Sequence, residues 1–215
     1  MIFLFKRKWF IFEFIFFICC IISAIAWKFY PPYRGLVKYF FYTIISHLYI
    51  SIFPHEPVLL YYGKIYNPFA IAVIGGIAAT LAGFIDYETI NTVVKLKSVK
   101  KFYSDAKLYK KSVDFFSKAP FLMIFIAALT PVPFYPFKFL ATASDYPEDR
   151  YLLALFTGRT PRYFILAYTG KIINIPNWIL IAAFIIMFLW AGIKKFQEFM
   201  KNRKKVPSKV QNPKH

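Results

Sequence analysis

The chain has few of the groups that catalyse reactions or bind metals. Its 215 residues include two cysteines, three histidines and ten acidic residues. Cys19 and Cys20 are adjacent, so their spacing suits neither a disulfide framework nor a metal site. The sequence also lacks a His/Glu metal-binding spacing, a Gly-x-Ser-x-Gly elbow and a Walker loop. We therefore predict a protein that is not an enzyme and that binds no metal or cofactor.

Apolar residues, in contrast, are abundant. Hydrophobic residues make up 59% of the chain and aromatic residues 22%, and the mean hydropathy is +0.49. A soluble domain is about 45–50% apolar even when glycine is counted. The excess predicts an all-α integral membrane protein with several spans and no separate soluble domain.

The positive charge is large and unevenly placed. The formal net charge is +18, and basic residues gather at 6–8, at 95–118 and at 194–214. Nucleic-acid binding is the first interpretation of so basic a chain. Each cluster, however, flanks an apolar run, as basic residues do at the cytoplasmic ends of membrane spans. We therefore expect no nucleic-acid partner, and we expect membrane lipids with anionic headgroups to bind the second and third clusters.

Apolar runs predict about four full spans. A helix needs about 20 residues to cross a bilayer, and the candidate runs are 9–27, 69–94, 148–168 and 178–193. The first run has no small-residue cleavage site, which favours a retained anchor over a signal peptide. Residues 34–52 are amphipathic, and they either lie on the membrane surface or lead into the segment that follows.

Two stretches of the chain have the same proline spacing. Pro54, Pro57 and Pro68 form the first set, and Pro133, Pro136 and Pro147 form the second. Proline removes a backbone donor and breaks helices. Broken backbone survives at membrane depth only inside protein or along a wet cavity. Matching broken segments in two halves of a chain point to a transporter-like site.

The charge distribution orients these two segments. With the N-terminus in the cytoplasm, four spans place all three basic clusters on the cytoplasmic side. The broken segment at 52–67 then enters from outside, and the one at 119–146 enters from inside. We therefore predict an inverted repeat with two re-entrant hairpins, formed at Pro54, Pro57, Pro131, Pro133 and Pro136. If a broken segment crosses the membrane instead, this opposite orientation is lost.

Charged residues inside the apolar segments are the candidate site. Such charges are costly in a bilayer and are usually functional or paired. Arg159, Arg162 and Lys138 are predicted to bind an anionic phosphate, for which a guanidinium fork is well shaped. Glu56 and Asp86 would supply counter-charge or carry a proton. The alternative is a set of internal salt bridges that only holds the two repeats together.

Two histidines lie near these segments. His47 and His55 could carry protons, because the imidazole titrates near neutral pH. Hydrogen bonding at the membrane interface is the alternative role for each of them.

Two motifs resemble a known family. They are Thr130-Pro131-Val132-Pro133, in the second broken segment, and Gly158-Arg159-Thr160-Pro161-Arg162, in the span after it. Over about residues 50–171 the chain is similar to the DedA family, also called the VTT-domain or SNARE-associated Golgi protein family. The resemblance implies two hairpins that face each other across the bilayer, movement of lipid between leaflets, and proton coupling in some members. It also matches Glu56, Asp86 and Arg159 to the family's charged positions.

Together these observations predict a flippase- or scramblase-like transporter for a phosphate-bearing lipid, either a phospholipid or a polyprenyl phosphate, with proton coupling as an option. A secondary transporter of a small solute and a non-transporting assembly factor remain alternatives. We expect a bacterial inner membrane with both chain ends in the cytoplasm, and a homo-oligomer is compatible with the sequence. The expected parts are an anchor with an amphipathic segment at 1–49, a core at 50–171, a last span at 172–193 and a basic cytoplasmic tail at 194–215.

Overall fold

The computed structural model describes residues 2–48, 53–94, 107–173 and 175–204, and this part of the chain is all-α, as predicted. The first half contains α1 (Ile2–Phe29), a 3-10 turn η1 (Pro31–Tyr33), α2 (Arg34–His47), α3 (Glu56–Ile65) and α4 (Pro68–Val94). The second half contains α6 (Lys107–Lys118), α7 (Pro120–Leu129), α8 (Tyr135–Ala143), α9 (Glu148–Ile172) and α10 (Asn177–Lys204).

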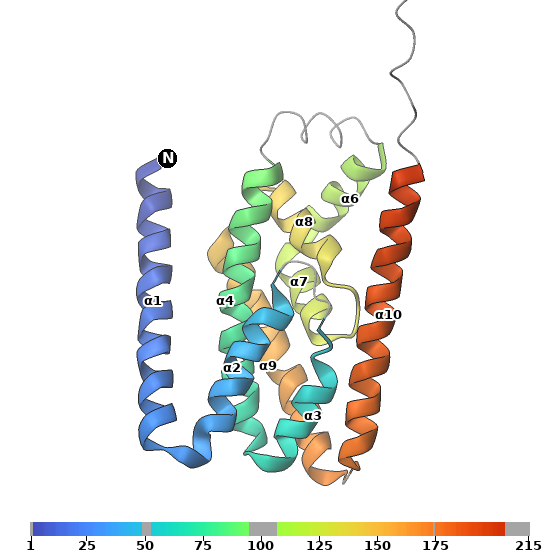
Figure 1. The fold of residues 1–215 in the computed structure, drawn as a ribbon. Helices are drawn as coiled ribbons and strands as arrows, with labels where there is room; N and C mark the ends of the chain where they lie inside the picture. The colour runs from blue at the N-terminus through green and yellow to red at the C-terminus, as the bar shows by residue number, and fades with distance from the viewer. Residues whose placement is uncertain (1, 49–52, 95–106, 174, 205–215) are drawn as a thin grey trace, which may run out of the picture.

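The helices run between two ends of an elongated bundle (Figure 1). In that view α1 descends, α2 rises to about the middle, α3 returns to the lower end and α4 runs back to the top. The second half reverses this order, because α7 descends to the middle, α8 returns upward and α9 runs to the bottom. The start of α1 and the last turns of α4 and α10 therefore lie at the same end.

The repeated prolines occupy matching places in the two halves. Pro57 and Pro136 are the second residues of α3 and α8. Pro68 begins α4, and Pro147 is the residue that precedes α9. Proline suits the start of a helix because its missing N–H would have no intrahelical partner there. The other hairpin prolines (Pro54, Pro131 and Pro133) lie in the turns before α3 and α8.

The first hairpin begins earlier than the sequence predicted. The broken segment was placed at 52–67, but its first arm is α2, which starts at Arg34. One face of α2 packs on α4, where Phe40 and Ile44 contact Ala78 and Ala82. The described part of 34–52 thus leads into the hairpin, and residues 49–52 lie outside the described residues.

Small residues bring α9 close to both hairpins. A Cβ atom on Gly63 of α3 would overlap the backbone of Ala167 on α9, and one on Gly170 of α9 would overlap Leu60. A Cβ on Gly158 would lie 2.7 Å from the carbonyl oxygen of Phe125 on α7. Small residues allow such close backbone contact between helices in membranes. The helix α9 is therefore the element against which α3, α4 and α7 pack.

Two described helices are long and apolar enough to cross a membrane by themselves, namely α1 over Phe12–Phe29 and α4. The pair α6–α7, bent by 91°, adds a third candidate, and α10 is apolar over Asn177–Trp190. In contrast, α9 is charged at several positions, and it remains one helix of 25 residues through Pro161. Of the four predicted full spans, α1 and α4 are both long enough and apolar enough to cross a membrane, and α9 and α10 do not meet both conditions.

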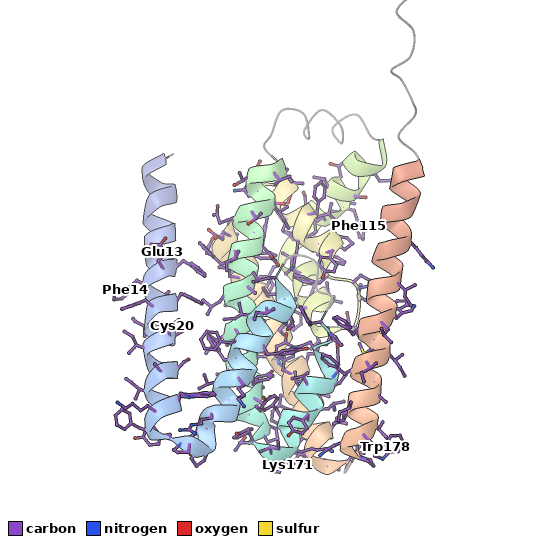
Figure 2. The ribbon with its side chains drawn as sticks, viewed as in Figure 1. Glu13, Phe14, Cys20, Phe115, Lys171 and Trp178 are labelled. Atoms are coloured by element: carbon purple, nitrogen blue, oxygen red, sulfur yellow. The ribbon has the colours of Figure 1, made fainter. Side chains whose placement is uncertain are left out.

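The two outer helices expose apolar side chains. On α1, Phe14 lies on the side away from the other helices, and Trp178 lies at the lower end of α10 (Figure 2). Phe14 is 58% exposed and Trp178 is 69% exposed. Such surfaces fit a lipid environment better than water.

The C-terminal end is more helical than the sequence predicted. α10 extends to Lys204, well beyond the predicted end of the last span at Ile193. The predicted basic connection at 95–118 is helical over α6. Its first part, 95–106, and the tail after Lys204 lie outside the described residues.

Candidate functional site

A cavity of about 360 Å³ lies where the tips of the two hairpins meet. The first hairpin contributes Ser46, His47 and the turn from Phe53 to Glu56. The second contributes Phe134, Tyr135 and Lys138, and the remaining wall comes from α9 and α10. The cavity therefore brings together side chains that are far apart in the sequence, within a molecule that is otherwise mostly apolar.

Arg159 of α9 lies on the cavity wall. The residue is 8% exposed, and its guanidinium lies 5.0 Å from the centre of the Phe134 ring. This cation–π contact holds a charge in place without neutralising it. Among the described residues Arg159 forms no ion pair. It therefore brings an unbalanced positive charge to the cavity.

Lys138 of α8 is held by an ion pair with Asp86 of α4. The two side chains are 4% and 0% exposed. The ammonium group also donates to the carbonyl oxygen of His47 at 3.3 Å. Lys138 thus links α8 to α4 and to the end of α2.

Arg162 links the two hairpin tips. Its Nη2 donates to Oε1 of Glu56 at 2.8 Å, and its Nη1 donates to the carbonyl oxygen of Thr130 at 2.9 Å. Glu56 begins α3, and Thr130 is the residue that follows α7. The Arg162 and Glu56 side chains are 22% and 40% exposed, so this pair is more open than the one at Lys138.

A cluster of hydrogen-bonded side chains adjoins the cavity. His47 Nε2 lies 2.7 Å from the hydroxyl of Tyr163, and His55 Nδ1 lies 3.2 Å from the hydroxyl of Ser46. The two imidazole rings are 4.5 Å apart and nearly perpendicular. Within the described part of the chain, no group of three or more His, Cys, Asp or Glu residues could hold a metal.

The five predicted charged residues thus gather in one region, but with specific partners. Arg159, Lys138 and Glu56 line the cavity, and Asp86 and Arg162 bind two of these lining residues. Two of the three cations assigned to phosphate are already paired with carboxylates. These two pairs have the form of the alternative prediction, a set of internal salt bridges. Arg159 is in neither pair, so it keeps the positive charge that an anion site requires.

Sequence reasoning did not find the connected cluster. His47 and His55 were noted singly, but Ser46 and Tyr163 were not connected with them. Tyr163 lies on α9, 116 residues after His47. The one local signal was that His47 shortly precedes the first proline turn and that His55 lies within it. The contributions of Met187 and Trp190 from α10 had no sequence signal.

Comparison with known proteins identifies the core of the chain. No curated protein and no solved structure matches it. A family model for the VTT domain matches residues 53–172, from the turn before α3 to the end of α9. The matched region contains Glu56, Asp86, Lys138 and both arginines of the site. With its apolar helices, this match makes the chain an integral membrane protein. The chain belongs to the VTT-domain family, which is the DedA/SNARE-associated Golgi protein family.

Proposed function

We propose that this transporter-like membrane protein moves a phosphate-bearing lipid headgroup, from a phospholipid or a polyprenyl phosphate, between the two leaflets. The observation that carries the proposal is the buried guanidinium of Arg159 on the wall of the cavity. A buried charge in a membrane protein is costly and usually serves function. Phosphate oxygens fit the planar donors of an arginine.

The other charged residues have separate roles in this proposal. Lys138 and Arg162 hold the hairpins through Asp86 and Glu56, which keeps their own charges balanced. Arg159 then supplies the principal contact with the phosphate. The cavity accommodates the polar headgroup, while the acyl chains stay in the lipid beside α10, whose Met187 and Trp190 line the same cavity.

We further propose that α1, α4, α9 and α10 cross the membrane and that the α2–α3 and α7–α8 hairpins are re-entrant from opposite sides. The matched prolines at the starts of α3 and α8 support an inverted repeat. The basic ends of α1 and α10 at one end of the bundle support a cytoplasmic location for both chain ends. A bacterial inner membrane remains our prediction for its location.

The test is reconstitution in liposomes. Transbilayer movement of a headgroup-labelled phospholipid and of a labelled polyprenyl phosphate would be followed for the wild type and for Arg159→Gln. Arg150→Gln is the matched control, because Arg150 is an exposed arginine on the same helix. We expect Arg159→Gln to slow movement at least tenfold and Arg150→Gln to leave it unchanged.

Other outcomes would favour the alternatives. Uptake of inorganic phosphate without lipid movement would indicate a solute transporter. No movement of either lipid by a folded wild-type protein, with or without a proton gradient, would contradict the proposal and favour an assembly role.

A further inference from the structure

The hydrogen bonds of His47 determine where its proton lies. Nδ1 lies 2.8 Å from the carbonyl oxygen of Thr43, which can only accept, so Nδ1 carries the hydrogen. In a neutral imidazole the other nitrogen is then an acceptor. Nε2 accepts from the hydroxyl of Tyr163 at 2.7 Å. Both nitrogens of His47 therefore have partners.

The same reasoning gives a different result for His55. The hydroxyl of Ser46 donates its single hydrogen to the carbonyl oxygen of Thr43 at 3.0 Å. The same hydroxyl oxygen lies 3.1 Å from His47 Nδ1 and 3.2 Å from His55 Nδ1. With its hydrogen bonded to Thr43, it accepts from the ring N–H of His55. His55 Nε2 is left with a lone pair, and it is buried without a hydrogen-bond partner among the described residues. His55 thus has a vacant proton-accepting position.

Burial of the ring opposes a proton on His55 most strongly, and nearby positive charges oppose it further. Arg159 and Arg162 both act on it electrostatically, and Lys138 lines the same cavity. Glu56 offsets Arg162, and Asp86 offsets Lys138. The charge of Arg159 has no such partner among the described residues, so it opposes a further positive charge on the imidazole.

Both charged and neutral titratable groups surround His55. The groups that face it from all packed elements are Tyr39, Tyr42 and His47 of α2, Glu56 of α3, Lys138 of α8, and Arg159, Arg162 and Tyr163 of α9. α10 contributes only Met187 and Trp190 to the cavity wall. Arg159 is therefore the charge whose neutralisation would most change the proton affinity of His55.

We infer that His55 Nε2 takes up a proton when an anionic headgroup binds Arg159, so that proton binding and headgroup binding are coupled. One proton passes from the aqueous buffer to Nε2, the imidazole becomes an imidazolium, and Nδ1–H stays bonded to Ser46. Coupling between two sites is reciprocal. A fall in pH therefore strengthens headgroup binding. Because the coupling uses the anion site at Arg159, it rests on the proposed function.

The experiment measures proton uptake directly. Dihexanoylphosphatidylglycerol, a soluble lipid with a phosphodiester that does not titrate near neutral pH, would be titrated into the detergent-solubilised protein by calorimetry. Repeating the titration in two buffers of different ionisation enthalpy gives the protons taken up per lipid bound. We expect net uptake by the wild type, and an affinity that rises by up to about tenfold per unit decrease in pH.

A variant of His55 and a control variant identify the group that takes up the proton. His55→Asn keeps a donor toward Ser46 but has no titratable nitrogen, and we expect it to bind lipid without proton uptake. Arg150→Gln, at an exposed position of α9, is the control and should retain the uptake. If His55→Asn does not fold, as judged by gel filtration, His55→Gln provides the same test.

The outcomes distinguish the coupling from the proposed function. Lipid binding to the wild type without proton uptake, or uptake that persists in a folded His55 variant, would overturn the coupling and leave the anion site intact. No lipid binding to the folded wild type would overturn both.

Discussion

Lys138 on α8 and Asp86 on α4 form an ion pair that is almost completely hidden, with side chains 4% and 0% exposed. Two buried charges depend on each other, because removing one leaves the other in surroundings of low polarity. The ion pair thus fixes the position of α8, in the second hairpin, against α4.

We predict that Lys138→Met destabilises the protein by about 3–5 kcal/mol, because Asp86 loses its ammonium partner. The double variant Lys138→Met/Asp86→Leu should recover most of this loss, since neither charge remains. Thermal unfolding in detergent of the two single variants and the double variant measures the coupling between the residues. Equal and additive losses would contradict a direct interaction.

The more exposed pair should behave differently. We expect Glu56→Gln to cost at most about 1 kcal/mol, because partly exposed ion pairs contribute little and the amide oxygen can still accept from Arg162. Arg162→Ala removes the contacts to both Glu56 and Thr130 and should cost about 1.5–3 kcal/mol. The unfolding midpoints of the two variants measure these losses of stability. A larger loss in Glu56→Gln than in Arg162→Ala would contradict this ranking.

Alanine substitutions test the close contact between α3 and α9. Gly63→Ala and Gly170→Ala each place a methyl group against the backbone of the other helix, and we expect a loss of about 1–3 kcal/mol from overpacking. Gly192→Ala on α10 is the control, since nothing lies within 4 Å of the added atom. It should be neutral or stabilising by up to about 1 kcal/mol. Thermal stability in detergent provides the readout.

Removing one hydroxyl tests the histidine cluster. Tyr163→Phe keeps the ring but leaves His47 Nε2 without its donor, so we predict a loss of about 1–3 kcal/mol. Tyr168→Phe, at a half-exposed position on the same helix, should change stability by less than about 0.5 kcal/mol. If unfolding midpoints of the two variants coincide, the hydroxyl of Tyr163 does not stabilise the fold.

The positions of helix starts were predictable because proline acts locally. Pro68 and the Tyr146-Pro147 pair marked the starts of α4 and α9 by geometry that involves only neighbouring residues. The role of α2 was not predictable in the same way. An amphipathic pattern requires an apolar partner for one face, but it does not distinguish a bilayer from the small residues of α4.

The pairing of charges also depended on tertiary structure. Lys138 and Asp86 are 52 residues apart, and Arg162 and Glu56 are 106 residues apart. Composition identified the charged residues inside apolar segments, but only the packing of α8 on α4 and of α9 on α3 selects the partners. The proline repeat indicated where helices begin in each half, but it did not indicate which of the three cations forms no ion pair among the described residues.

The glycine contacts have a mechanical consequence. Backbone pressed against backbone at Gly63, Gly158 and Gly170 leaves no intervening side chains that could change rotamer and let the helices slide. We therefore expect α3, α7 and α9 to move as one rigid body. In contrast, α10 packs mainly on α3. There Lys64 of α3 donates a hydrogen bond to the side chain of Asn177, the first residue of α10. On the proposed function, we expect α10 to swing about this lower attachment when a headgroup enters the cavity, while α3, α7 and α9 stay fixed to one another.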